Sequence, residues 1–152
     1  MNYSLALLVL VVLFPIKGHD QVETERMKDL LESQSFIFQA NSAQPPGGVS
    51  VNVATFDNFI KLKEGFCTMR LPYFGTYRLT SGEGLIRADQ EIVNAKIRAN
   101  KKGTRFQLSF YVSNKEEKFK VSIAVGAKGW ATVLVKSVNR PTITYYGQLK
   151  AL

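Results

Sequence analysis

The chain has 152 residues, 45% of them hydrophobic, and a formal net charge of +8. This length suits a single domain with a core of its own. His19 is the only histidine and Cys67 the only cysteine. The composition therefore excludes Ser-His-Asp and Cys-His catalysis, multi-histidine metal sites and an intramolecular disulfide. We expect no catalytic residues, no cofactor and no metal, and thus a protein that is not an enzyme.

The N-terminal segment contains an unbroken apolar run at residues 5–14. A run of this length is too short to cross a bilayer comfortably as a helix, but it has the length of a signal-peptide core. Gly18 offers a small residue for cleavage. We therefore expect residues 1–18 to be a signal peptide and residues 19–152 to be one exported domain, periplasmic or secreted. The alternative is an uncleaved membrane anchor, because residues 1–4 contain no Lys or Arg.

Residues 20–34 have the pattern of an amphipathic helix, with apolar residues at helical spacing and charged residues between them. Asp20, followed three residues later by Glu23, is typical of a capping box at a helix start. We expect this helix to pack across an open edge or end of a sheet. Its predicted apolar face consists of Met27, Leu30 and Leu31.

The following part of the chain predicts short strands separated by turns. Pro45 and Pro46 end the first of them, because proline has no amide hydrogen for a strand ladder. The dipeptide Glu64-Gly65 joins two apolar runs and predicts a hairpin. The predicted strands are residues 35–43, 49–53, 59–63, 66–71 and 85–88.

The C-terminal stretch, residues 91–149, carries the clearest strand pattern. Apolar and polar side chains alternate in residues 104–113 and 117–125, as in strands with one buried and one wet face. Residues 129–137 are apolar on both faces, which predicts a central strand covered on two sides. Residues 142–149 complete a set of five strands joined by short turns.

Repeated hairpins with one apolar face must bury that face against a second sheet or by rolling up. The sequence therefore predicts a mainly β domain, an antiparallel β-sandwich or partly closed barrel built from hairpins, with one N-terminal α-helix. Cys67 lies in an apolar stretch without a nearby histidine, so we expect its thiol to be buried in the core.

Three stretches carry a family resemblance. They are Phe36-Ile37-Phe38 with Ala43-Gln44-Pro45, Leu71-Pro72-Tyr73-Phe74-Gly75, and residues 139–147. On these stretches the chain resembles the Bacteroidetes exported-protein family of unknown function DUF4251. The resemblance implies a small secreted or lipid-anchored protein with a helix followed by antiparallel strands. It implies no reaction, and this chain has no lipid-attachment cysteine near its expected cleavage point.

The motif residues allow two roles. In the first, their aromatic rings form a lip that stacks on a sugar ring or another apolar ligand. In the second, Pro72 ends a strand and the aromatic residues cap the core, while an arginine holds carbonyl groups of its turn. The candidate ligand-binding residues are Tyr73, Phe74, Arg140 and Tyr145.

Positive charge is concentrated in the C-terminal part of the chain. Residues 1–91 contain 8 basic and 10 acidic groups, and residues 92–152 contain 12 basic and 2 acidic groups. Many of these basic residues occupy outward strand positions, so pairing of adjacent strands would gather them on one face. Such a face favours an anionic partner; the alternative is a solvated face whose lysines prevent edge-to-edge aggregation. The candidate basic-face residues are Lys96, Arg98, Arg105, Lys118 and Lys120.

Taken together, these features predict an exported envelope protein that acts as a non-catalytic binding or interaction module. The expected partner is an anionic envelope component, such as lipid head groups, a glycan or another protein. Nucleic acid is not expected for an exported chain, and membrane contact is expected only through the signal peptide or the surface. One alternative is a carrier of a small apolar ligand inside a β-barrel. The other is an unrecognised hydrolase, which would require two converging carboxylates.

Overall fold

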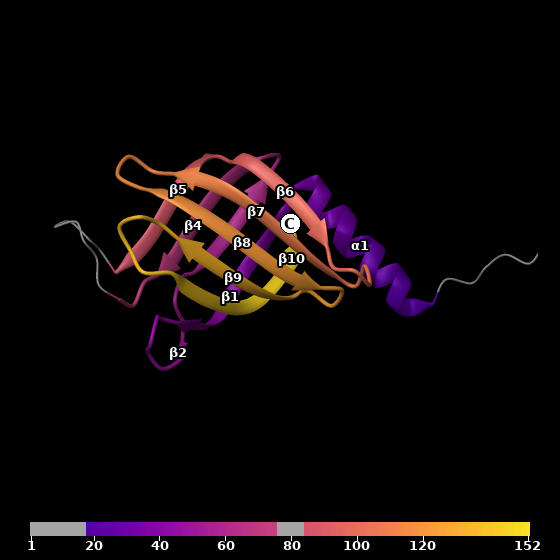
Figure 1. Ribbon diagram of the computed structural model, residues 1–152, viewed down its shortest axis with the longest axis horizontal. Helices are drawn as coiled ribbons and strands as arrows, with labels where there is room; N and C mark the ends of the chain where they lie inside the picture. The colour runs from indigo at the N-terminus through magenta and orange to yellow at the C-terminus, as the bar shows by residue number, and fades with distance from the viewer. Residues whose placement is uncertain (1–17, 76–83) are drawn as a thin grey trace, which may run out of the picture.

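The computed structural model describes residues 18–75 and 84–152. One antiparallel sheet curls into a partly closed barrel, and a single helix lies at one end of it (Figure 1). The predicted class is therefore confirmed, and the barrel is the form of it that the chain adopts. The expected signal peptide lies outside the described residues, apart from Gly18. The strands are β1 (Phe36–Gln44), β2 (Val51–Asn52), β3 (Phe59–Lys63), β4 (Phe66–Pro72), β5 (Leu85–Glu91), β6 (Val93–Ala99), β7 (Arg105–Ser113), β8 (Lys118–Gly126), β9 (Trp130–Lys136) and β10 (Ile143–Ala151).

The sheet consists of two runs of neighbouring strands that meet where β1 pairs with β10. Its strand order is β5-β4-β3-β1-β10-β9-β8-β7-β6, with β2 paired to β1. The β1–β10 ladder runs from Phe36 opposite Ala151 to Gln44 opposite Thr144. At the other side of the barrel β5 approaches β7, so the sheet curls almost onto itself. Closure of this kind buries one whole face of the sheet.

A β-bulge interrupts the ladder of β1 and β10 between Ala40 and Ser42. The buried Asn58 side chain serves the backbone there. Its Oδ1 accepts a hydrogen bond of 2.8 Å from the Ala40 amide, and its Nδ2 donates to the carbonyls of Ala40 at 3.1 Å and Val53 at 2.8 Å. These bonds satisfy backbone groups that would otherwise be buried without partners, which is why a polar residue is tolerated in this position.

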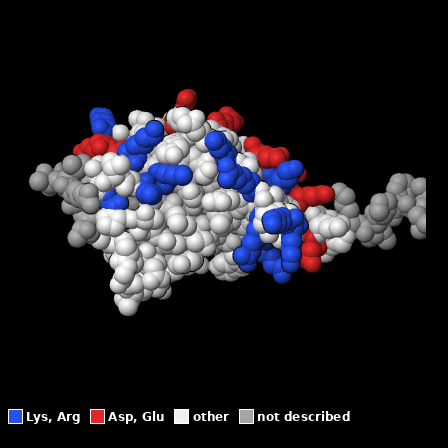
Figure 2. Space-filling model, viewed as in Figure 1, with Lys and Arg blue, Asp and Glu red and all other residues white. Residues whose placement is uncertain are grey.

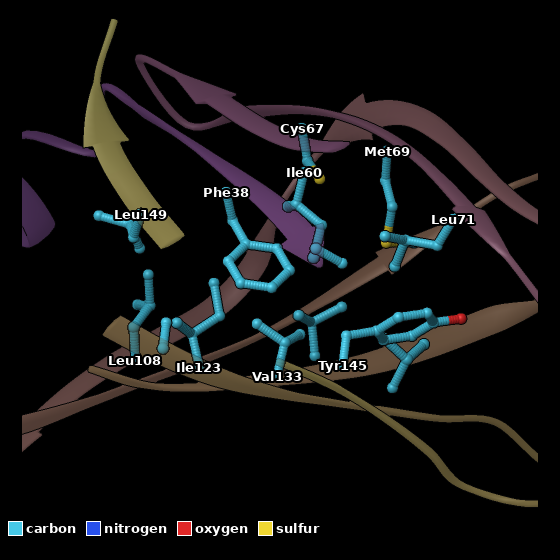
Figure 3. Packing of buried hydrophobic residues seen from close by; sticks show 14 of the residues in the cluster. Phe38, Ile60, Cys67, Met69, Leu71, Leu108, Ile123, Val133, Tyr145 and Leu149 are labelled. Atoms are coloured by element: carbon cyan, nitrogen blue, oxygen red, sulfur yellow. The ribbon is translucent and has the colours of Figure 1, made fainter. Parts of the chain in front are cut away.

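Side chains from both halves of the sheet fill the barrel interior. Phe38, Ile60 and Met69 point from one wall toward Ile123, Val133 and Tyr145 on the opposite wall (Figure 3). Inward positions alternate with outward ones along each strand, as the sequence pattern of β7 and β8 predicted. A barrel of about eight strands has an interior that side chains can fill. The apolar core therefore occupies the space that an internal ligand would need.

The helix α1 (His19–Ser33) covers one end of the barrel (Figure 1). It buries Met27 and Leu31, and Leu30 packs against the same core, so the predicted apolar face is confirmed. The predicted capping box at Asp20 is wrong. Gly18 occupies the N-cap position, where no side chain caps the helix, and Asp20 instead lies in the first turn, where its charge suits the helix dipole. The helix in the described ranges is not long and apolar enough to cross a membrane.

Two strand predictions need correction. Residues 49–53 form only the short strand β2, because the turn at residues 45–48 leaves few residues to pair with β1. The prediction that residues 129–137 form a strand covered on both faces is wrong as well. Trp130 is 61% exposed and Leu134 41% exposed on the outer side of β9. The helix covers the end of the barrel rather than its wall, so nothing in the described chain covers these side chains.

The seam between β1 and β10 generates a prediction about stability. A Cβ atom at Gly147 would lie 2.0 Å from the carbonyl oxygen of Gln39 and 2.7 Å from the Cα atom of Ala40. Both atoms belong to the backbone and cannot easily move aside. We therefore expect Gly147→Ala to lower the free energy of unfolding by about 1–3 kcal/mol or more, since overpacking typically costs this much. Urea denaturation measures this.

Gly126→Ala is the matched control, because a Cβ atom there meets nothing within 4 Å. It should leave the urea midpoint nearly unchanged. Equal midpoints for the Gly147→Ala variant and the unmodified protein would contradict the close approach of β1 to β10.

Candidate functional site

The outer side of β6, β7 and β8 carries a hollow of about 490 Å³. Lys96 and Arg98 on β6 lie opposite Ser109 and Gln107 on β7, and Lys120 on β8 lies opposite Tyr111. Strand pairing therefore brings three of the predicted basic residues into the lining of one hollow. We call the outward cations Lys96, Arg98, Lys118, Lys120 and Lys136, with Tyr111 among them, the basic face.

The aromatic ring of Tyr111 organises one end of the basic face. The Nζ atom of Lys118 lies 4.9 Å from the ring centroid, and that of Lys120 lies 5.9 Å from it. Both distances fall within the range of cation–π attraction. On the next strand Lys136 lies directly opposite Lys120. Like charges directly opposite each other destabilise a sheet, so the fold accepts a cost to concentrate positive charge here.

The basic face has no acidic counterpart within its own surface. In the described part of the chain, none of its five cations forms an ion pair with a carboxylate; the ion pairs there involve other residues. Lys and Arg side chains cross the face of the molecule in Figure 2, and the visible Asp and Glu side chains lie along its margins. The positive potential of this surface is therefore available to an external anion.

Arg105 is the one predicted basic-face residue outside the basic face as defined here. It is the first residue of β7 and lines a second, adjacent hollow. This hollow has a volume of about 690 Å³ and extends over the outer side of β8, β9 and β10 to β1. Trp130 and Tyr146, which are 61% and 43% exposed, stand in its lining. We call it the aromatic groove, defined by Arg105, Lys128, Trp130, Thr132, Tyr146 and Ser42.

The motif residues Tyr73, Arg140 and Tyr145 meet at the end of the barrel opposite α1, and they are buried. The Nε atom of Arg140 lies 3.1 Å and 3.0 Å from the two carboxylate oxygens of Glu117, whose side chain is completely buried. Ser137 donates a further hydrogen bond to this carboxylate. The guanidinium carbon of Arg140 also lies 4.9 Å from the centroid of the Tyr73 ring.

The two tyrosines tie the strand ends of this buried cluster together. The Tyr73 hydroxyl donates to the carbonyl of Pro141 at 3.3 Å, and the Tyr145 hydroxyl donates to that of Pro72 at 2.7 Å. Burial raises the pKa of both hydroxyls, although the nearby Arg140 partly opposes the rise. Both therefore stay protonated and keep donating at neutral pH.

Phe74, the remaining candidate, is half-buried and packs edge-on against Phe56 with ring centroids 6.2 Å apart. The candidate ligand-binding residues are thus mainly a structural cluster, which favours the second of their two predicted roles. Arg140 binds the carboxylate of Glu117 there. Within the described residues, no three His, Cys, Asp or Glu side chains gather as metal ligands would.

Sequence reasoning missed several residues of the two hollows. Lys136 and Tyr111 occupy outward positions of strands in which polar and apolar side chains alternate. Knowledge of the strand register would have allowed both to be predicted as part of the basic face. Trp130 gave a misleading signal, because an outward aromatic residue in an apolar segment resembles one in a strand covered on both faces. Tyr146 occupies an outward position of β10. Glu117 gave none, since 23 residues separate it from Arg140.

The sequence and the fold of this chain can also be compared with those of known proteins. The model of the family described as "Domain of unknown function (DUF4251)" matches residues 19–149. The chain belongs to the DUF4251 family. It is also similar to the crystal structure, at 1.95 Å resolution, of a DUF4251 family protein from Bacteroides eggerthii DSM 20697, with a TM-score of 0.69 and 22% sequence identity. The match covers 86% of this chain and 88% of that one and shows the shared fold. A search of curated proteins found no match.

In this DUF4251 protein the buried cluster should contribute strongly to stability. Removing one partner of a buried ion pair leaves the other charge unpaired, at a cost of about 3–5 kcal/mol. We therefore expect Glu117→Gln and Arg140→Met each to lower the free energy of unfolding by about that amount. The double variant should lose less than the sum of the two, as measured by denaturant unfolding in a double-mutant cycle. Strictly additive losses would contradict direct coupling of Glu117 with Arg140.

Cys67 of this DUF4251 protein is completely buried, as predicted. Burial, with a smaller contribution from the charge of Asp89, raises the pKa of its thiol from 9.0 to about 12. The stability that depends on the neutral thiol is fully present below pH 9 and is lost as the pH rises toward 12. Between pH 9 and 10 the free energy of unfolding should fall by up to about 1.4 kcal/mol more in the unmodified protein than in Cys67→Ala. Identical pH slopes in chemical denaturation would refute this.

Proposed function

We propose that this protein is an exported, non-catalytic binding module of the envelope, periplasmic or secreted, that holds an anionic ligand on its basic face. The observation that carries the proposal is the gathering of five outward cations over β6, β7, β8 and β9 without a carboxylate partner among the described residues. Lys120 and Lys136 are even placed opposite each other. A bound anion would relieve this repulsion, which gives the ligand part of its affinity.

The physics of exposed charge indicates what kind of anion fits. A solvent-exposed ion pair contributes about 0–1 kcal/mol, so one anionic group would be held weakly. A ligand with several anionic groups engages several cations at once, and its contributions add. The basic face spans the four neighbouring strands β6 to β9, and cations line its hollow on both the β6 side and the β8 side. It therefore suits a multivalent anion, and this binding should weaken as salt screens the charges.

The alternatives of a carrier and a hydrolase have less support. Side chains from both walls fill the barrel, and the hollow of the basic face and the aromatic groove lie on its outer side. Of the acidic residues in the C-terminal part, Glu117 is buried against Arg140 and Glu116 lies in the exposed turn beside it. Neither provides the pair of facing carboxylates that glycoside hydrolysis needs. The export of the module is supported by the apolar run at residues 5–14.

Charge reversal on β8 tests the proposal. Lys118→Glu/Lys120→Glu should lower the affinity for inorganic polyphosphate and for polygalacturonate about tenfold or more at low salt, because two attractions become repulsions. Isothermal titration calorimetry at two salt concentrations measures both affinity and screening. The affinity of the unmodified protein should fall at high salt.

Lys61→Glu/Lys63→Glu is the matched control. It makes the same change of net charge at two outward positions of β3, on the other half of the sheet. It should reduce the affinity far less than the β8 variant. Equal losses of affinity in the two double variants would show that only net charge matters. An affinity that does not change with salt concentration would contradict binding at the basic face.

A further inference from the structure

The aromatic groove exposes the only tryptophan of the chain. Tryptophan is a large apolar residue and is usually well buried, yet Trp130 is 61% exposed on the outer side of β9. Tyr146, on the neighbouring strand β10, is 43% exposed. Exposed aromatic residues that cluster on one surface are typical of a binding site. Neither residue belongs to the core or to the basic face, so the groove needs its own explanation.

The strand register places the two aromatic residues side by side. Trp130 is opposite Gln148 and Tyr146 is opposite Thr132, so the two rings stand on diagonally adjacent positions of β9 and β10, about 7–8 Å apart at their Cα atoms. The neighbouring outward positions of β8 are Ala124 and Gly126, which line the groove with little side chain. The large rings of Trp130 and Tyr146 therefore project next to the small residues of β8. They form an aromatic wall on one side of the groove.

The chemistry of the lining points to a sugar that carries negative charge. The electron-rich face of an aromatic ring attracts the partly positive C–H bonds on the flat side of a sugar ring. Ser42, Thr132 and Thr104 offer hydroxyl groups for hydrogen bonds to sugar hydroxyls, and Arg105 and Lys128 offer positive charge for carboxylate or sulfate groups. A fatty acyl chain would contact only the aromatic rings favourably, and inorganic polyphosphate would bind only the cations. An acidic sugar can contact both.

The groove continues directly into the basic face. Gln107 and Ser122 line the hollow of the basic face, and the next outward residues along the same two strands, Arg105 and Ala124, line the groove. Gln107 and Ala124 are themselves paired across β7 and β8. The two hollows thus lie end to end on one outer surface. An extended polymer can contact both.

We propose that the aromatic groove and the basic face together bind one chain of an acidic polysaccharide, with sugar rings stacked on Trp130 and Tyr146 and acidic groups held by the cations. This inference rests on the proposed function, because it assigns the class of anion that the basic face holds. It adds the aromatic groove as the part of the site that distinguishes a polysaccharide from any other polyanion.

The lone tryptophan allows a direct test. Polygalacturonate should change the emission of Trp130 on binding, whereas inorganic polyphosphate should bind without a comparable change. Tyr146→Ala keeps the reporter and should lower the affinity for polygalacturonate about fivefold or more, while the affinity for polyphosphate stays within about twofold. Trp130→Ala, measured by calorimetry, should show the same selectivity. Phe66→Ala, an exposed aromatic residue of β4 outside both hollows, is the matched control and should bind both polymers normally.

The outcomes separate this inference from the proposed function. If Tyr146→Ala and Trp130→Ala bind both polymers normally while Lys118→Glu/Lys120→Glu does not, the groove inference is overturned and the basic face stands. If no variant alters binding, or if neither polymer binds, both are overturned. A Trp130 emission that shifts with protein concentration alone would assign the groove to contact between two copies of the chain and would also overturn the inference. Circular dichroism of each variant confirms that it is folded.

Discussion

The pairing of β1 with β10 holds the two halves of the barrel together. The first and the last strand of the barrel lie side by side, and they join the half made of β3, β4 and β5 to the half made of β6 through β9. Their backbones approach so closely that only glycine fits at residue 147, and Asn58 satisfies the backbone where the ladder shifts register. Because this seam holds the sheet in a curve, one side of every strand faces a common core and the other faces solvent.

The two ends of the barrel are closed by different means, whereas the basic face and the aromatic groove lie on the wall between them. The helix covers one end with Met27 and Leu31. At the other end the Glu117–Arg140 pair, stacked beneath Tyr73, neutralises buried charge and fastens strand ends to one another. Tyr73, Arg140 and Tyr145, which the sequence offered as ligand-binding residues, therefore help to hold this end of the fold together. The outward cations of β6, β8 and β9 and the exposed rings of Trp130 and Tyr146 lie on the wall between these ends, where we propose that they bind the ligand.

Local pattern predicted much of the fold, because the alternation of side chains along a strand follows directly from its geometry. The alternate apolar residues of β7 from Phe106 to Val112, and those of β8 from Phe119 to Val125, were assigned correctly to the inner side. The same alternation identified Lys118 and Lys120 as outward. What the sequence lacked was the register between strands. Register alone shows that Lys136 faces Lys120 and that Arg105 belongs with Trp130 rather than with Lys96. Contacts across many residues, such as Arg140 with Glu117, left no local signal, and an outward tryptophan was mistaken for a covered one.

We propose that the outer surface of β6 through β10 binds the ligand of this protein. The most direct measurement is an NMR titration of the isotopically labelled protein with short polygalacturonate, following the amide signals of every strand. We expect the amide signals to shift along β6, β7 and β8 around Lys96, Tyr111 and Lys120. The shifts should continue to Trp130 and Tyr146, and the signals of α1 and β3 should stay unchanged. Shifts concentrated around Tyr73 and Arg140, or among the inward residues of the barrel, would contradict it and place the site at the barrel end or inside it.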